Sequence, residues 1–267
     1  MRRDVADVAL ADHVFAPHYA LPLDHGCREP RVTMRAAPGS DAAAVSELLL
    51  GERFAVVDAG GDWMWGFSRH DHYVGYVPAA ALGAVIEPTH RVTALAALLF
   101  AAADIKSPVR ARLPIGAQLA GVEEGDFLRV DQGFVHRRHV APIDRVETDP
   151  VAVALRLVGT PYRWGGRSGD GIDCSGLVQL AFAACGQAVP RDSDQQRAAI
   201  GRALEADEPA ARGDLIFFPG HVGLMADPDH MVHANAHWMA TLCEPLADIC
   251  ARLPAGASII ARRRPTW

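Results

Sequence analysis

A series of short landmarks occurs twice in the first half of the chain, in the same order. The four pairs are Arg31–Thr33 with Arg91–Thr93, Leu48–Gly51 with Leu113–Gly116, Gly61–Trp63 with Gly125–Phe127, and Gly75–Val77 with Gly133–Val135. Their offsets lie between 58 and 65 residues, and insertions or deletions in loops produce this kind of drift. This part of the chain is therefore predicted to fold as two copies of one unit.

Each copy alternates apolar and polar residues in short runs. In the first copy, Arg53–Asp58 and Trp63–Ser68 flank the turn Gly60-Gly61-Asp62. Alternation with a period of two is typical of half-buried strands, so each copy of about 55 residues is expected to form a small five-stranded β-barrel. Residues 94–103 have strong helix propensity, yet the repeat favours a strand and a loop there. With Tyr73–Val77, the pattern resembles bacterial Src-homology-3-like domains, more closely in the first copy.

The chain length allows three domains. Residues 1–30 are spaced by Pro17, Pro22 and Pro30 and are predicted to form an irregular arm that packs on another part of the chain. The expected division is the arm with the first barrel at 1–88, the second barrel at 89–144, and a third domain at 145–267. At about 150 residues per domain, the 267 residues indicate roughly two domains, or three small ones.

The composition disfavours several classes of partner. Lys and Arg number 26 and Asp and Glu 32, which gives a net charge of −6 and argues against nucleic acid or an anionic membrane surface. Arg2 and Arg3 are followed by acidic residues rather than by an apolar signal segment. The five cysteines include no C-x-x-C pair, which is typical of free thiols in a reducing compartment. We expect a cytoplasmic monomer with no cofactor, no nucleic-acid partner and no membrane partner.

From about residue 146 the pattern changes to helices followed by strands. Val151–Val158 has helical spacing, and Asp173 stands where the N-cap of a second helix belongs, with Gly186 at its end. The runs 214–218, 221–225 and 231–234 are then strand-like. This order predicts an α+β domain with an antiparallel sheet.

Three side chains in this domain have the arrangement of a nucleophilic site. Cys174 falls on the first turn of the helix near Asp173, where the helix dipole and unpaired N–H groups favour a thiolate. His221 begins one strand and His233 lies in the next, and antiparallel pairing would bring them side by side. A nucleophilic thiol needs an imidazole as base and a third group to orient it. Cys174 is therefore the candidate nucleophile, His221 the base and His233 the orienting group.

Five motifs occur in order around these residues. They are Pro161-Tyr162-x-Trp164-Gly165-Gly166, Asp173–Val178, Pro190–Ser193, Gly213–Phe218 and His221–Gly223. Together they resemble the NlpC-type cysteine peptidases, which cleave bacterial cell-wall peptides. The resemblance implies a papain-like fold for residues 145–267. It also implies that the Tyr162 hydroxyl and the backbone N–H of Cys174 form the oxyanion hole.

Two Src-homology-3-like barrels ahead of such a domain resemble one branch of that family. These are the γ-D-glutamyl-L-diamino acid endopeptidases, which recycle muropeptides of the L-Ala-γ-D-Glu-diaminopimelate type with a free N-terminal L-alanine. The residues implied to bind this peptide are Asp173, Ser175, Ser193, Trp164 and, from the first barrel, Tyr73. The family also places a glutamate beside the amine, for which Glu47 is the nearest candidate; Glu47 could equally be a solvated charge in a loop. A blocked alanine would leave Asp173 unpaired, so it should be rejected.

Two other interpretations stay open. His221, His230, His233 and His237 could ligate a divalent metal, which would make a metal-dependent hydrolase in which Cys174 only packs. Alternatively, the barrels could belong to a non-catalytic module that binds wall peptides.

Overall fold

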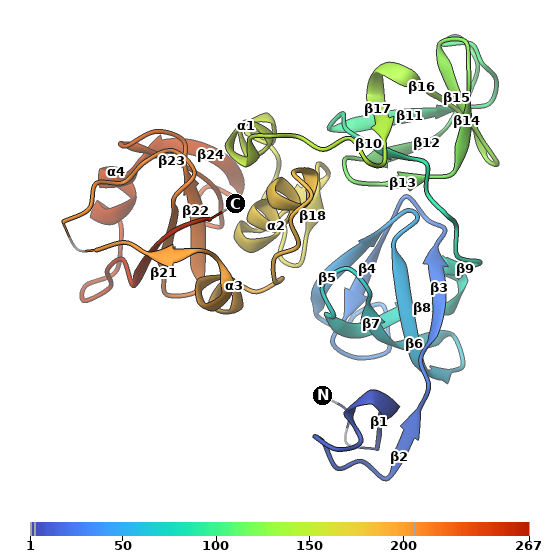
Figure 1. Cartoon of the computed structure of the whole chain (residues 1–267), viewed down its shortest axis with the longest axis horizontal. Coiled ribbons are helices and arrows are strands. Elements are labelled where there is room, and N and C mark those ends of the chain that lie inside the picture. Colours follow the sequence, from blue (N-terminus) through green and yellow to red (C-terminus); the bar gives the residue numbers. More distant parts are fainter. Residues whose placement is uncertain (1, 3, 206, 267) are drawn as a thin grey trace. The chain divides into compact units, whose positions relative to one another are not determined.

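The computed structural model describes residues 2, 4–205 and 207–266 (Figure 1). The chain divides into two compact units, Met1–Asp144 and Arg145–Trp267. Among the described residues, no helix is long and apolar enough to cross a membrane.

The first unit begins with a parallel pair of short strands, β1 (Val5–Asp7) and β2 (His18–Ala20), joined through a 3-10 helix, η1 (Val8–Leu10). Seven strands then form the sheet of the first barrel, in the order β5-β4-β8-β7-β6-β3-β9. They are β3 (Leu23–Cys27), β4 (Arg31–Arg35), β5 (Ala44–Leu49), β6 (Arg53–Gly60), β7 (Trp63–Ser68), β8 (Val74–Pro78) and β9 (Leu82–Gly83), with the 3-10 helix η2 (Ala79–Ala81) before β9.

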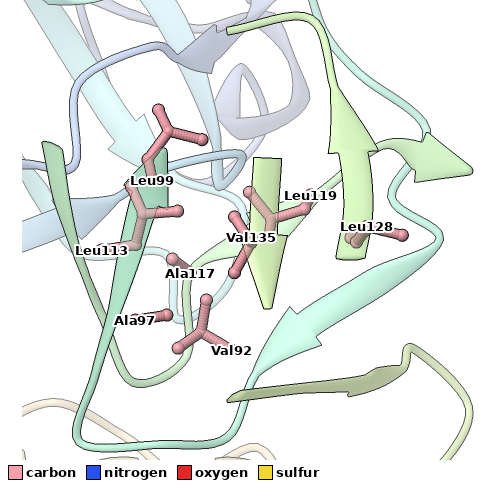
Figure 2. Packing of buried hydrophobic residues seen from close by; sticks show 8 residues of the cluster. All are labelled: Val92, Ala97, Leu99, Leu113, Ala117, Leu119, Leu128 and Val135. Carbon is pink, nitrogen blue, oxygen red and sulfur yellow. The ribbon is translucent and has the colours of Figure 1, made fainter. Parts of the chain in front are cut away.

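The second barrel combines a five-stranded sheet, β12-β11-β16-β15-β14, with a three-stranded sheet, β13-β10-β17. Its strands are β10 (His90–Val92), β11 (Ala96–Phe100), β12 (Val109–Pro114), β13 (Gln118–Leu119), β14 (Gly121–Glu124), β15 (Phe127–Val130), β16 (Gly133–His136) and β17 (Val140–Pro142), with the 3-10 helix η3 (Arg137–His139) before β17. Figure 2 shows the apolar side chains that make up its core: Val92, Ala97, Leu99, Leu113, Ala117, Leu119, Leu128 and Val135. Ala97 and Leu99 are buried while Leu98 between them is exposed, so alternation outweighs helix propensity in β11, and the predicted strand is confirmed.

The repeat in the sequence is also a repeat in strand pairing. β3 pairs with β6 and β9 as β10 pairs with β13 and β17, and β4 pairs with β5 and β8 as β11 pairs with β12 and β16. The turn glycines agree: Gly51 and Gly116 have φ of +81° and +90°, and Gly61 and Gly125 have +63° and +57°. These left-handed conformations favour glycine, so both copies need it at the same two turns.

The pairing corrects where the first copy begins. Arg31–Thr33 lie in β4, whereas Arg91 and Val92 lie in β10, the counterpart of β3, so this landmark pair is not equivalent. The first copy starts at β3, inside the segment predicted to be an irregular arm. Pro22 and Pro30 flank β3 without interrupting it, which is why they did not prevent its pairing with β6.

The predicted number of strands per barrel is also wrong. The first barrel has seven strands in one sheet, and the second has eight in two sheets. The additional strands are short segments such as β9 and β17, whose pairing depends on contacts far along the chain. Ahead of the first barrel, Val5 packs against Val57 and Trp65, so the start of the chain does pack on another part of it.

The second unit is an α+β domain, as predicted. Its six-stranded sheet has the order β20-β25-β21-β22-β23-β24, and every pairing in it is antiparallel. Its elements are α1 (Pro150–Arg156), β18 (Arg167–Ser168), β19 (Gly171–Ile172), α2 (Cys174–Ala184), α3 (Ser193–Ala199), β20 (Arg202–Ala203), β21 (Leu215–Phe218), β22 (His221–Met225), β23 (His230–Asn235), β24 (Ala240–Pro245), α4 (Leu246–Ala251) and β25 (Ala261–Arg264). Helix α2 packs against α1, β22 and β23, which brings its N-terminus to the sheet.

Candidate active site

Cys174 is the first residue of α2, and Asp173 is the N-cap, as predicted. The Asp173 carboxylate accepts a hydrogen bond from the backbone N–H of Gly176 at 2.7 Å. A Cβ on Gly176 would lie 2.3 Å from the carbonyl oxygen of Gly166, and one on Gly166 would lie 2.3 Å from that of Gly171. The glycines around Cys174 therefore let backbone segments approach one another at the start of the helix.

His221 and His233 meet across the sheet. The Nε2 of His221 and the Nδ1 of His233 lie 2.8 Å apart. Leu224 pairs with Val232, so Gly223 faces His233, and His221 projects from the same face two residues earlier. A Cβ on Gly223 would lie 2.9 Å from the Cβ of His233, so the absence of a side chain allows this contact. The prediction that the two imidazoles lie side by side is confirmed.

Because α2 packs against β22, Cys174 lies next to Val222, the residue that follows His221. The backbone of Val222 hydrogen-bonds the Cys174 sulfur and, with the backbone of Ser175, acts to lower the thiol pKa. The Nε2 of His221 contacts His233, so Nδ1 is the other nitrogen of that ring.

Burial shifts the pKa values of Cys174 and His221 in opposite directions. Desolvation, followed by the negative charge of Asp173, raises the pKa of the Cys174 thiol to about 11. Desolvation, followed by the proximity of His233, lowers the pKa of His221 to about 3. Burial therefore opposes the effect of the helix N-terminus on the Cys174 thiol, and both shifts favour the neutral forms of Cys174 and His221.

Asp173 is already paired in this structure. Arg191, which precedes α3, donates from Nη1 to Oδ1 at 2.9 Å and from Nη2 to Oδ2 at 2.5 Å. Gly165 N–H also donates to Oδ2 at 2.8 Å, and the Ser175 hydroxyl donates to Oδ1 at 3.3 Å. The expectation that Asp173 is left unpaired without a substrate amine is wrong, because Arg191 neutralises it. Arg191 lies within the Pro190–Ser193 motif, but nothing local indicated its partner.

Tyr162 lies in the electrostatic environment of Cys174 and Asp173. Burial, followed by the electrostatic effects of Cys174 and Asp173, raises the pKa of Tyr162 to about 12, so its hydroxyl stays protonated and can donate. Its backbone N–H donates to the carbonyl of Met239 at 2.9 Å, which anchors the segment beside β24.

The other predicted substrate-binding residues are divided between the two units. Ser175 is buried, and its hydroxyl accepts a hydrogen bond from Arg191 Nη1 at 2.9 Å. Ser193 is half-buried at the first turn of α3, and Trp164 is exposed. Tyr73 belongs to the first unit, in the loop between β7 and β8, where it packs on the core of the first barrel.

Glu47 also belongs to the first unit, and it is not a solvated loop charge. It lies in β5, is buried, and forms an ion pair with Arg31 at 3.4 Å. That alternative for Glu47 is therefore wrong, while its role beside a substrate amine stays a prediction.

The four histidines proposed as metal ligands do not converge. His230 and His233 are three residues apart on β23, and a strand places such residues on opposite faces. His230 contacts Asp227 at 3.0 Å, whereas His233 contacts His221. In the part of the chain that the structure describes, no group of three or more His, Cys, Asp or Glu side chains could hold a metal ion. The histidine-ligated metal centre is therefore wrong.

Glu244 contacts His233 through the ring nitrogen that does not contact His221. Its Oε1 lies 2.8 Å from the Nε2 of His233. No local pattern marks Glu244, because its proximity to His233 follows from the register of β23 and β24.

Two parts of the chain are similar to known protein families. Residues 159–245 match the NlpC/P60 family, and residues 34–82 match the bacterial dipeptidyl-peptidase Sh3 domain. Dipeptidyl-peptidase 6 of Lysinibacillus sphaericus is 42% identical over 85 residues, which are 32% of this chain and 31% of that protein. The gamma-D-glutamyl-L-lysine dipeptidyl-peptidase of Bacillus cereus is 27% identical over 223 residues, 71% of this chain and 66% of that protein.

The matched part spans about a third of the length of the first of these relatives. A crystal structure of an NlpC/P60 family protein from Bacillus cereus superimposes with a TM-score of 0.76 at 21% identity, covering 91% of this chain and 99% of that one. This likeness shows the fold. The chain therefore carries an NlpC/P60 cysteine peptidase domain of papain-like fold, preceded by a bacterial Src-homology-3-type domain.

Proposed function

We propose that the protein is a cysteine endopeptidase that hydrolyses the bond between γ-D-Glu and the diamino acid in cell-wall peptides with a free N-terminal L-alanine. The observation that carries the proposal is the 2.8 Å contact of His221 with His233, beside the helix that begins at Cys174. The relatives' names, gamma-D-glutamyl-L-lysine dipeptidyl-peptidase and Dipeptidyl-peptidase 6, support this bond and the need for a free N-terminus.

The reaction begins from the neutral pair. The Cys174 sulfur attacks the γ-carbonyl carbon of D-Glu while its proton passes to Nδ1 of His221. The oxyanion accepts hydrogen bonds from the Tyr162 hydroxyl and from the Cys174 backbone N–H, which lacks a partner inside the helix. The tetrahedral intermediate collapses to a thioester, and the diamino acid's amine leaves with the proton from His221. Water then attacks the thioester, gives a proton to His221, and the thiol regains it.

Within the second unit, the alanine pocket would be formed by Ser175, Ser193 and Trp164. Since Arg191 already balances the charge of Asp173, the ammonium group must find further acceptors, and the hydroxyls of Ser175 and Ser193 have that chemistry. An acetylated alanine has no charge and two donors fewer, so it should bind poorly.

We also propose that the protein acts in the cytoplasm as a monomer that recycles muropeptides. All five cysteines are free, and one of them is the nucleophile of this proposal, which suits a reducing compartment.

The test is to incubate the protein with L-Ala-γ-D-Glu-diaminopimelate and measure release of L-Ala-D-Glu by mass spectrometry. Cys174→Ala should abolish release, as should iodoacetamide, while EDTA should have no effect. Inhibition by EDTA with retained activity of Cys174→Ala would instead indicate metal-dependent hydrolysis. Tight binding of the peptide without turnover at any pH would indicate a binding module.

Substrate selection is tested with the same peptide carrying an N-acetyl group. The acetylated peptide should be cleaved at least about 100-fold more slowly, because a site that binds a buried charged group discriminates strongly against its absence. Equal turnover of both peptides would remove the free amine from the proposal and leave the peptidase activity intact.

A further inference from the structure

The contacts of His233 extend away from the nucleophile to Glu244. His233 stands directly opposite Leu242 in the pairing of β23 with β24. Glu244 lies two residues beyond Leu242, so it projects from the same face and meets His233 diagonally. This register places Glu244 Oε1 at 2.8 Å from Nε2 of His233, on the side opposite to the Nδ1 that contacts His221.

A carboxylate at this position determines which nitrogen of each ring carries a proton. Glu244 forms a salt bridge with Arg252 at 2.5 Å, and an ionised carboxylate can only accept hydrogen bonds. His233 must therefore donate from Nε2, which leaves its Nδ1 as an acceptor. His221 must then donate from Nε2 to that Nδ1, which leaves its own Nδ1 unprotonated. That nitrogen is the one that has to take the thiol proton.

The surroundings hold Glu244 in place. The guanidinium of Arg252, at the end of α4, also lies over the ring of Trp238, 5.6 Å from its centroid. His233 is fully buried, and burial lowers its pKa while the carboxylate of Glu244 opposes that effect. A buried imidazole with one of its ring N–H groups unsatisfied would be costly, so the tautomer that Glu244 selects is strongly preferred.

We propose that Glu244 is a positioning residue of the peptidase reaction: through His233 it holds His221 in the tautomer whose Nδ1 can accept the Cys174 proton. This inference rests on the proposed function for its kinetic consequence, but the tautomers exist without substrate. During attack, the negative charge of Glu244 also favours the positive charge that develops on the histidine pair.

The tautomers can be measured directly in the resting protein by NMR after labelling histidine with ¹⁵N. Wild type should show His221 and His233 both protonated at Nε2. Glu244→Gln keeps an acceptor oxygen and should keep both tautomers, whereas Glu244→Leu removes the acceptor and should change that of His233. Protonation of His233 at Nδ1 in the wild type would overturn the proposal, and this result does not depend on the stability of any variant.

The kinetic arm compares the same variants on L-Ala-γ-D-Glu-diaminopimelate. Glu244→Leu should lower kcat at least about tenfold with KM nearly unchanged, as loss of a partner behind a functional histidine does elsewhere, and Glu244→Gln should recover part of it. If the wild type does not cleave this peptide, the alkylation rate of Cys174 by iodoacetamide replaces kcat. A wrong role for Glu244 can therefore be distinguished from a wrong choice of substrate.

A matched control distinguishes positioning from loss of a salt bridge. Glu208 pairs with Arg202 and Arg264 in the same unit, and its side chain is 21% exposed, against 15% for Glu244. Glu208→Leu should leave kcat and the histidine ¹⁵N shifts unchanged. Equal losses in Glu208→Leu and Glu244→Leu, or a Glu244→Leu variant with wild-type kcat and shifts, would overturn the proposal.

Discussion

Asp173 and Arg191 form a two-pronged salt bridge beside Cys174, with both side chains almost fully buried at 7% and 2% exposure. The pair connects the N-cap of α2 with the segment that leads into α3. The residue that precedes Cys174 is thus held by the helix on one side and by Arg191 on the other.

The first prediction concerns this pair. Arg191→Met should lower the free energy of unfolding by about 3–5 kcal/mol, because it leaves a buried carboxylate without its counter-charge. Urea denaturation measures the change. The matched control is Arg212→Met, which breaks a surface pair with Asp149 whose side chains are 45% and 43% exposed, and should cost about 0–1 kcal/mol. Equal costs for the two variants would contradict the structural role of Arg191.

The second prediction follows from the raised thiol pKa. Since the pKa of Cys174 is about 11, its thiolate fraction should increase with pH throughout the range from 6 to 10. Alkylation by iodoacetamide, followed at the Cys174 peptide by mass spectrometry, should therefore accelerate about tenfold for each pH unit. Exposed Cys243 serves as an internal control for reagent access. A rate that is constant between pH 5 and 8 would show a preformed thiolate–imidazolium pair and exclude the neutral resting state.

The third prediction tests the close contact at Gly223. Gly223→Ala would place a Cβ 2.9 Å from that of His233 and 2.8 Å from Met231, so His233 must shift away from His221. We expect peptidase activity to fall at least about tenfold, since small misplacements of reacting groups have large effects on rate. Gly83→Ala, where the nearest atom would be 3.6 Å from the new Cβ, should retain activity. Wild-type kcat in Gly223→Ala would show that the histidine contact tolerates displacement.

The fourth prediction isolates the Tyr162 hydroxyl. Tyr162→Phe should lower kcat by about 100- to 1,000-fold, as loss of one oxyanion donor does, with a much smaller change in KM. Steady-state kinetics on L-Ala-γ-D-Glu-diaminopimelate measure both. Tyr19→Phe also removes a hydrogen-bonded hydroxyl, one that donates to Val14, and should leave kcat unchanged. A change confined to KM in Tyr162→Phe would assign the hydroxyl to binding rather than to the oxyanion.

Much of the peptidase domain could be predicted from the sequence because its signals are local. Asp173 and Gly186 bound α2 by their capping preferences, and the run His221–Met225 is a strand with the predicted bounds. The position of Cys174 at the helix start and of His221 and His233 on neighbouring strands follows from these short patterns. In the first unit, the repeat predicted two related copies, although it misplaced where the first one begins.

The sequence by itself determined where α2 and β22 begin and that Cys174 and His221 are their first residues, because capping and periodicity act over a few residues. Only the tertiary structure decided what surrounds those side chains. Arg191 and Glu244 reach their partners through packing and strand register, and Glu47 is buried by a strand that looked like a loop. The raised pKa of the Cys174 thiol has the same origin, because desolvation depends on every segment that covers the sulfur rather than on its neighbours in the chain.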